Sequence, residues 1–191
     1  HALDGLKGTS RWPKARRLDA VSYADLTVGP RHVYAMSDPG MLTAIDRKDG
    51  TIAWRHGRSM ARDFLIEGHG AATLHGDVVF AGLADGRLVA LASRDGGLVW
   101  ERRLGDERKG PYTDVDSTPV LAKVSGRPAV LAAAHNTGLF AHAENNGERI
   151  WRYDGEGLGQ PLVSGKRVYT VAGDGALAAR VGAAGVADDL D

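Results

Sequence analysis

The chain has 191 residues, and its 24 basic and 24 acidic side chains give a formal net charge of zero. A neutral chain argues against nucleic acid as the main partner, because nucleic-acid binding needs a basic surface. No cysteine is present, which excludes thiol catalysis, disulfide bonds and cysteine-ligated zinc within these residues. The longest uncharged run, residues 128–143, is too short and too often interrupted by polar residues to span a membrane.

A short phrase that ends in tryptophan recurs four times along the chain. In each copy an alanine precedes a glycine by six residues, and the glycine precedes the tryptophan by four. Successive tryptophans are 42, 46 and 51 residues apart. A four-stranded β-propeller blade takes roughly 40–50 residues, so each copy is predicted to be one blade. The tryptophans are Trp12, Trp54, Trp100 and Trp151, and the glycines are Gly8, Gly50, Gly96 and Gly147.

Each repeat contains short β-rich runs separated by turns. Asp-Gly and Asn-Gly sequences favour tight hairpins, because their central residues tolerate positive φ. A fifth, degenerate copy follows Gly175 and has Asp189 where the tryptophan belongs. Strands are predicted first at 33–36, 78–81, 130–133 and 168–171, then after a turn at 41–46, 88–92 and 139–143, and then after a second turn at the tryptophans.

Two residue types of the phrase are expected to join the blades. The small alanine of each third strand allows neighbouring blades to pack closely. The tryptophan is expected to fill the space between two blades and to donate its indole N–H to a carbonyl oxygen.

The fold class predicted from this pattern is an all-β β-propeller of four-stranded antiparallel blades. Residues 1–191 are expected to form one partial propeller that begins in the middle of a blade. It would hold about four to five blades of a larger ring of about seven or eight. A complete small ring, and a ring made by two chains, remain open as alternatives.

The repeat resembles the pyrroloquinoline-quinone (PQQ) type repeat. The phrase that carries the likeness is an aliphatic strand, a glycine turn and an Ala-Leu pair over residues 78–91, followed by Gly96 and Trp100. The likeness covers nearly the whole chain. It is specific for the fold and weak for the function, because enzymes, sensors and scaffolds share this repeat.

One segment points to a narrower family. Residues 112–121, Tyr-Thr-Asp-Val-Asp-Ser-Thr-Pro-Val-Leu, resemble a segment of the BamB family of outer-membrane lipoproteins, which belong to the β-barrel assembly machinery. The resemblance implies an eight-bladed periplasmic propeller that contacts the membrane only through a lipid anchor outside this chain. It also implies that Asp114 and Asp116 bind the POTRA domains of the barrel-assembly protein BamA. A preceding loop would supply Phe64, Ile66 and Glu67, where Glu67 replaces an arginine of the family and reverses its charge.

The residues alone leave a second interpretation open for both loops. Phe64 and Ile66 can belong to the buried first strand of a blade. Asp114 and Asp116 lie two residues apart and so share one face of an extended segment. Each carboxylate can also accept hydrogen bonds from nearby loop N–H groups, which is a local role.

No catalytic, cofactor or metal site is predicted. An EF-hand that began at Asp114 would need glycine at its sixth position and glutamate at its twelfth, and the chain has Pro119 and Ser125 there. The quinoprotein dehydrogenases, which resemble the chain in their repeat, carry a Cys-Cys pair and an acidic calcium site that the chain does not match. We therefore expect a non-enzymatic scaffold of the periplasm and outer membrane. A kinase-linked sensor propeller and a fragment of a PQQ-dependent dehydrogenase are the alternatives.

Overall fold

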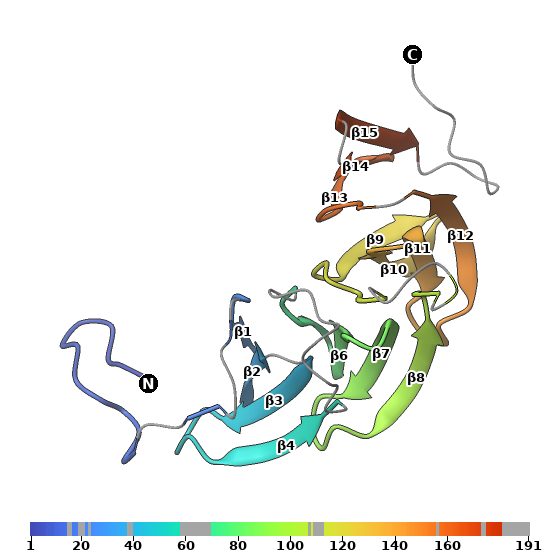
Figure 1. The fold of residues 1–191 in the computed structure, drawn as a ribbon. Helices are drawn as coiled ribbons and strands as arrows, with labels where there is room; N and C mark the ends of the chain where they lie inside the picture. Colours follow the sequence, from blue (N-terminus) through green and yellow to red (C-terminus); the bar gives the residue numbers. More distant parts are fainter. Residues whose placement is uncertain are drawn as a thin grey trace.

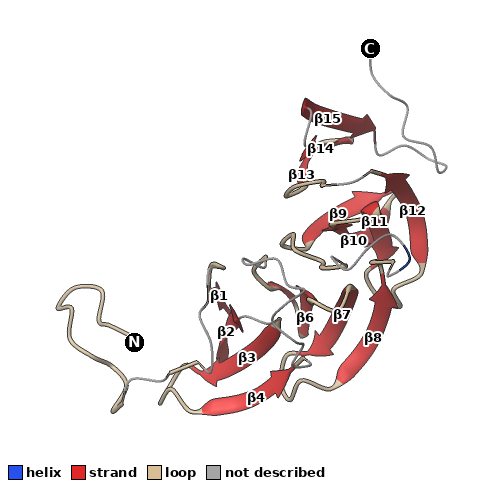
Figure 2. Cartoon of the chain, viewed as in Figure 1, coloured by secondary structure: helices blue, strands red, loops and turns tan. Residues whose placement is uncertain are grey.

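The computed structural model describes residues 1–14, 17–18, 22, 24–37, 40–57, 70–106, 108, 113–155 and 157–172, and the backbone of residues 175–180. Within these residues the regular structure consists of β-strands, and no α-helix is present. Figure 2 shows the strands joined by short loops. The predicted all-β class is confirmed.

Four antiparallel sheets follow one another along the chain and fan out along an arc (Figure 1). Within each sheet, every strand pairs with its neighbours in sequence, so each sheet is an up-and-down meander. The strands of the first two sheets are β1 (Thr27–Val28), β2 (His32–Ser37), β3 (Met41–Asp46) and β4 (Ile52–His56), then β5 (Thr73–His75), β6 (Val78–Gly82), β7 (Arg87–Ala92) and β8 (Leu98–Arg103). The strands of the last two sheets are β9 (Val120–Val124), β10 (Arg127–Ala134), β11 (Gly138–Ala143) and β12 (Arg149–Asp154), then β13 (Leu162–Ser164), β14 (Arg167–Ala172) and β15 (Gly175–Arg180).

The strands predicted before and after the first turn of each repeat are the second and third strands of the observed sheets, and their bounds agree to within a few residues. The innermost strands β1, β5, β9 and β13 were not predicted, because they are short and carry no repeated phrase. The first strand of the second sheet is β5, which lies further along the chain than Phe64 and Ile66. Residues 58–69, which include Phe64, Ile66 and Glu67, lie outside the described part of the chain.

The fixed spacing of alanine, glycine and tryptophan follows from strand register. Ala44 pairs with Trp54, Ala90 with Trp100, and Ala141 with Trp151 across the two outer strands of each sheet. A register shift follows each of these alanines. The same pair of backbone hydrogen bonds closes the turn between these strands in each of the three sheets. In the first sheet, Gly50 N–H donates to the Asp46 carbonyl and Asp46 N–H donates to the Thr51 carbonyl. The glycine has φ +76°, which favours a residue without a Cβ.

The tryptophans join consecutive blades, as predicted. The Nε1 of Trp12 donates to the carbonyl oxygen of Arg47 at 3.0 Å. The Nε1 of Trp54 donates to Ser93 at 3.2 Å, and that of Trp100 donates to Glu144 at 2.8 Å. Each acceptor lies three residues before the turn glycine of the following sheet. The fourth indole, Trp151, has a buried N–H with no partner among the described residues.

Each tryptophan ring also lies against the turn glycine of the next blade. A Cβ at Gly50 would stand 2.6 Å from the Cδ2 of Trp12. The corresponding distance is 2.8 Å for Gly96 and Trp54, and 2.7 Å for Gly147 and Trp100. The indole therefore occupies the space where a side chain would be, and the glycine is required both by its φ and by its neighbour in the next blade.

The hydrophobic core is divided into three clusters, and each lies between consecutive sheets. The first combines Tyr34, Met36 and Trp54 of the first sheet with Val79 and Leu91 of the second. The second cluster joins the second and third sheets, and the third joins the third and fourth. Because each blade buries its faces against its neighbours, the blades stabilise one another in the manner of a repeat array.

Replacement of Trp100 by alanine is expected to lower the free energy of unfolding by about 3–5 kcal/mol, as for other large buried aromatic deletions. Trp100 is 5% exposed, and the substitution also leaves the Glu144 carbonyl without its indole donor. Urea unfolding followed by circular dichroism measures the change. Val99→Ala is the control on the same strand, because Val99 is 49% exposed. An equal shift for both variants would contradict the assigned role of the indole.

Gly96→Ala is expected to destabilise the protein by more than Gly126→Ala does. Both glycines have positive φ, +74° and +77°, which costs an alanine about 1–2 kcal/mol. Nothing lies within 4 Å of a Cβ at Gly126, whereas a Cβ at Gly96 meets the Trp54 ring. Overpacking should add about 1–3 kcal/mol at Gly96 alone. Matched urea titrations of the two variants test this difference, and equal midpoints would exclude a steric contribution from Trp54.

Candidate functional site

The segment of residues 113–119 links the outer strand β8 of the second sheet to the inner strand β9 of the third. Hydrogen bonds hold its backbone to both sheets. Val115 N–H donates to the Leu83 carbonyl at 3.2 Å, and His135 N–H donates to the Asp114 carbonyl at 2.9 Å. Val115 is fully buried, and its carbonyl oxygen would lie 2.3 Å from a Cβ at Gly82. The segment is therefore part of the joint between the two blades.

Two hydroxyl side chains extend this attachment. Ser117 Oγ accepts a hydrogen bond from Ala133 N–H at 2.8 Å, inside the third sheet. Thr118 Oγ1 accepts a hydrogen bond from Ala71 N–H at 2.9 Å. Thr118 N–H donates to Gln160 Oε1 at 2.8 Å, and Gln160 Nε2 donates to the Thr118 carbonyl at 2.9 Å. The segment thus connects the entry to the second sheet, the third sheet and the chain that leads to the fourth.

A close contact joins Gly70 to the segment that carries Asp114 and Asp116. Gly70 and Ala71 directly follow residues 58–69 in the sequence. A Cβ at Gly70 would lie 2.2 Å from the backbone nitrogen of Thr118, so the two backbones are in close contact. Gly70 therefore rests against the segment that carries Asp114 and Asp116, although the two are far apart in sequence.

Asp114 has a buried carboxylate. Its exposed fraction is 0%, and neither Oδ1 nor Oδ2 has a hydrogen-bond partner among the described residues. The pKa of Asp114 is raised to about 6, chiefly by burial and to a smaller extent by the nearby Asp116 carboxylate. Its own backbone N–H and His135 act in the opposite direction on the same pKa. A buried, unpaired carboxylate is costly to keep ionised, so it favours a cationic or hydrogen-donating partner.

Asp116 and His135 lie beside it and are more accessible. The Asp116 side chain is 25% exposed and the His135 side chain is 38% exposed. Asp116 Oδ2 and His135 Nδ1 are 3.8 Å apart. The sequence predicted a pair of carboxylates on one face. The structure places Asp114 inside the blade joint and Asp116 partly at the surface.

His135 completes this group and was not predicted as part of it. The sequence analysis placed the two aspartates, but no spacing rule connects them with a histidine that follows β10. The signal was its position immediately before the Asn136-Thr137-Gly138 turn, where a polar residue interrupts an apolar strand. Only the pairing of adjacent sheets brings that turn beside residues 113–119.

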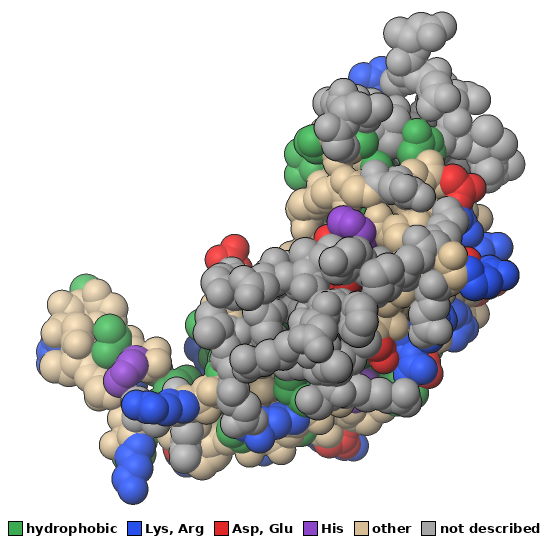
Figure 3. Space-filling view, viewed as in Figure 1, with side chains coloured by type: hydrophobic (Ala, Val, Ile, Leu, Met, Phe, Trp, Pro, Cys, Tyr) green, Lys and Arg blue, Asp and Glu red, His purple; other side chains and the backbone are tan. Residues whose placement is uncertain are grey.

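Among the described residues, no group of three or more His, Cys, Asp or Glu side chains is arranged to hold a metal ion. No helix within the same residues has the length and apolar character needed to cross a membrane. Figure 3 shows acidic and basic side chains scattered over one face of the arc.

Comparison with known proteins identifies relatives of this chain. The family described as "Outer membrane protein assembly factor BamB" matches residues 1–185. BamB of Escherichia coli K12 is 26% identical over 189 residues, which cover 76% of this chain and 47% of that protein. The 1-butanol dehydrogenase (quinone) of Thauera butanivorans is 28% identical over 145 residues, which cover 70% of this chain and 22% of the enzyme.

Among solved structures, BamB of Moraxella catarrhalis superposes with a TM-score of 0.80 at 23% identity. The match covers 93% of this chain and 54% of the Moraxella chain, and at this identity it shows the fold. The chain spans half or less of the length of the curated relatives it matches.

Stability should fall as the pH rises from about 4 to 6, because of Asp114. The folded-state pKa of about 6 lies above the value of about 3.9 for an unfolded aspartate. The folded protein therefore binds more protons in this window, so the stabilising contribution is complete below about pH 4 and is lost through pH 6. Asp114→Asn should remove this dependence, which amounts to up to about 3 kcal/mol.

Urea titrations at several pH values test this prediction. Asp77→Asn, at an exposed residue, serves as the control and should keep the pH profile of the unsubstituted protein. Identical profiles for Asp114→Asn and the unsubstituted protein would show that Asp114 is not the titrating group.

Proposed function

Because the chain belongs to the BamB family of outer membrane protein assembly factors, we propose that it is a non-catalytic scaffold of β-barrel assembly in the periplasm. It is part of a larger propeller associated with the outer membrane. Its inter-blade loops bind the POTRA domains of a BamA-like barrel-assembly protein. Its role is to hold these loops in a fixed arrangement rather than to carry out a reaction.

The observation that carries this proposal is the contact between Gly70 and Thr118 at one blade joint. Gly70 directly follows residues 58–69 in the sequence, and Thr118 belongs to the segment with Asp114 and Asp116. The joint itself is held by backbone hydrogen bonds and by the core of the second and third sheets. A rigid base of this kind reduces the entropy lost when the loops bind a partner.

The chemistry of the site suggests how the partner is recognised. Phe64 and Ile66 supply apolar anchors, which contribute most when they fill a pocket on the other protein. Asp116 offers a partly exposed carboxylate. The Asp114 carboxylate has no hydrogen-bond partner among the described residues, and it gains one when a cationic side chain reaches the joint. Glu67, which replaces an arginine of the family, favours a cationic residue at the opposing position.

A PQQ-dependent dehydrogenase fragment is the second candidate, favoured by the match to the quinone-dependent butanol dehydrogenase. That match covers 22% of the enzyme and rests on the shared repeat. The test is to supply PQQ and calcium ions to the full-length protein and to follow dye reduction with ethanol or 1-butanol. Reduction above the rate without protein would overturn the non-catalytic assignment.

The scaffold proposal predicts that Asp114→Asn combined with Asp116→Asn weakens binding to the POTRA domains. Loss of charged hydrogen bonds at an interface costs about 1.5–3 kcal/mol, or roughly a 10- to 150-fold increase in Kd. The substitutions keep the shape of both side chains, so the blade joint is preserved. Titration calorimetry with the full-length protein and purified POTRA domains measures the effect.

Asp25→Asn combined with Asp77→Asn is the matched control, since it removes the same charge at exposed residues. The control should bind as the unsubstituted protein does. Unchanged affinity of the Asp114/Asp116 variant, with circular dichroism as in the unsubstituted protein, would contradict the assigned role of these carboxylates.

A further inference from the structure

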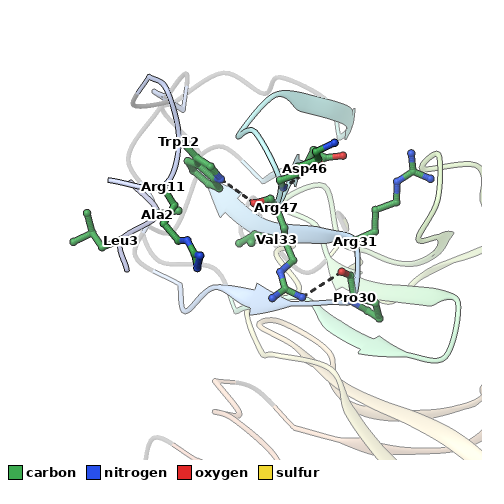
Figure 4. Close-up of a pocket in the computed structure, with 10 residues that line it drawn as sticks. Ala2, Leu3, Arg11, Trp12, Pro30, Arg31, Val33, Asp46 and Arg47 are labelled. Atoms are coloured by element: carbon green, nitrogen blue, oxygen red, sulfur yellow. Dashed lines mark hydrogen bonds between the residues drawn. The ribbon is translucent and has the colours of Figure 1, made fainter. Parts of the chain in front are cut away.

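A groove lies between the N-terminal segment and the first sheet, away from residues 113–119. It has a volume of about 910 Å³. Leu3, Arg11 and Trp12 form one side, and the turn before β2 and the turn after β3 form the other (Figure 4). The groove lies where β2 begins and β3 ends. His135 and Asp114 meet where β10, the second strand of the third sheet, ends, so the two sites are at opposite ends of the strands. The groove is lined by Ala2, Leu3, Arg11, Trp12, Pro30, Arg31, Val33, Asp46, Arg47 and Lys48.

Its lining is predominantly cationic. Three arginines and a lysine border the groove, against the single carboxylate of Asp46. Arg47 is held in place, because its Nη1 donates to the Gly29 carbonyl at 2.8 Å and to the Pro30 carbonyl at 3.2 Å. Arg11 is 3.9 Å from Asp4 and keeps 65% of its side chain exposed. Arg31 and Lys48 are exposed at the rim.

The repeat makes it possible to compare this groove with equivalent places in the same molecule. One backbone hydrogen bond defines the equivalence, since Arg47 N–H donates to the Arg31 carbonyl as Glu144 N–H donates to Pro128. A groove of about 390 Å³ also lies at that later position, between the second and third sheets. Its lining residues at the matching positions are Val99, Pro128, Glu144 and Asn145.

Three joints between consecutive repeats can be compared. Only the first, between the N-terminal segment and the first sheet, is cationic. At the four matched positions the first joint has four cations. The second joint has one acid and one cation, and the third has one acid. The propeller therefore does not need these charges in order to fold. The matched sets are Arg11, Arg31, Arg47 and Lys48, then Ala53, Asp77, Ser93 and Arg94, then Val99, Pro128, Glu144 and Asn145.

We propose that this groove binds an acidic segment of a partner protein, whose carboxylates pair with Arg11, Arg31 and Lys48. Guanidinium groups match carboxylates in two-point hydrogen bonds, and Arg47 is already oriented by backbone carbonyls. Leu3 also lines the groove and supplies an apolar wall for aliphatic side chains of the same segment. A flat membrane surface would fit less well, because the cations border a groove and not a plane.

The surface is separate from the POTRA-binding loops of the proposed function, and the inference does not depend on them. The test uses the full-length protein and a fluorescein-labelled peptide that alternates glutamate and leucine, at low ionic strength. The same peptide with glutamine in place of glutamate reports whether the carboxylates are needed. Vesicles of phosphatidylglycerol and phosphatidylcholine provide the membrane arm. Fluorescence polarisation and vesicle sedimentation are the two readouts.

Arg31→Glu combined with Lys48→Glu should raise the peptide Kd about tenfold or more, because two attractive charges become repulsive. Arg94→Glu combined with Arg127→Glu makes the same change in net charge at exposed arginines outside the groove and should leave the Kd within about twofold. Added salt should weaken binding to the unsubstituted protein.

Three results would overturn the proposal. They are equal binding of the glutamate and glutamine peptides, an equal loss in both double variants, and binding of vesicles without binding of the peptide. Arg31→Gln combined with Lys48→Gln guards against misfolding by charge reversal, and it should show a smaller loss in the same direction.

Discussion

The structure depends on one repeated contact, in which the indole of each blade lies on the turn of the next. The ring takes the place that a side chain would need at Gly50, Gly96 or Gly147, and its N–H satisfies a carbonyl of the same turn. The indole N–H and the turn carbonyl therefore find their partners in different blades. The blades are therefore stable as a row, and the core clusters between them follow the same division.

This framework leaves the connecting segments free to carry other residues. The joint between the second and third sheets is held by backbone hydrogen bonds from Val115 and His135 and by the hydroxyl of Ser117. Within that frame, the buried Asp114 carboxylate has no hydrogen-bond partner among the described residues, at a cost to stability that rises with pH. Such a group persists when the surrounding structure determines its position strongly, and it is a candidate for recognition of another molecule.

The repeat also separates what the fold requires from what it tolerates. Alanine, glycine and tryptophan keep their spacing in every complete copy, because strand register and the indole contact allow no shift. The four matched positions at these joints vary from four cations to one acid. Their variation changes the surface of one joint without altering the stack, so that similar joints can offer different partners different charges.

The sequence by itself determined the architecture, because the phrase that ends at Trp54 and Trp100 records register and blade period directly. It also located Asp114 and Asp116 in a connecting segment. Only the tertiary structure decided that Asp114 is buried, that His135 lies beside it and that Gly70 rests on Thr118. The physical reason is that blade stacking brings together residues far apart in the chain, and burial and charge pairing arise from that stacking rather than from local spacing.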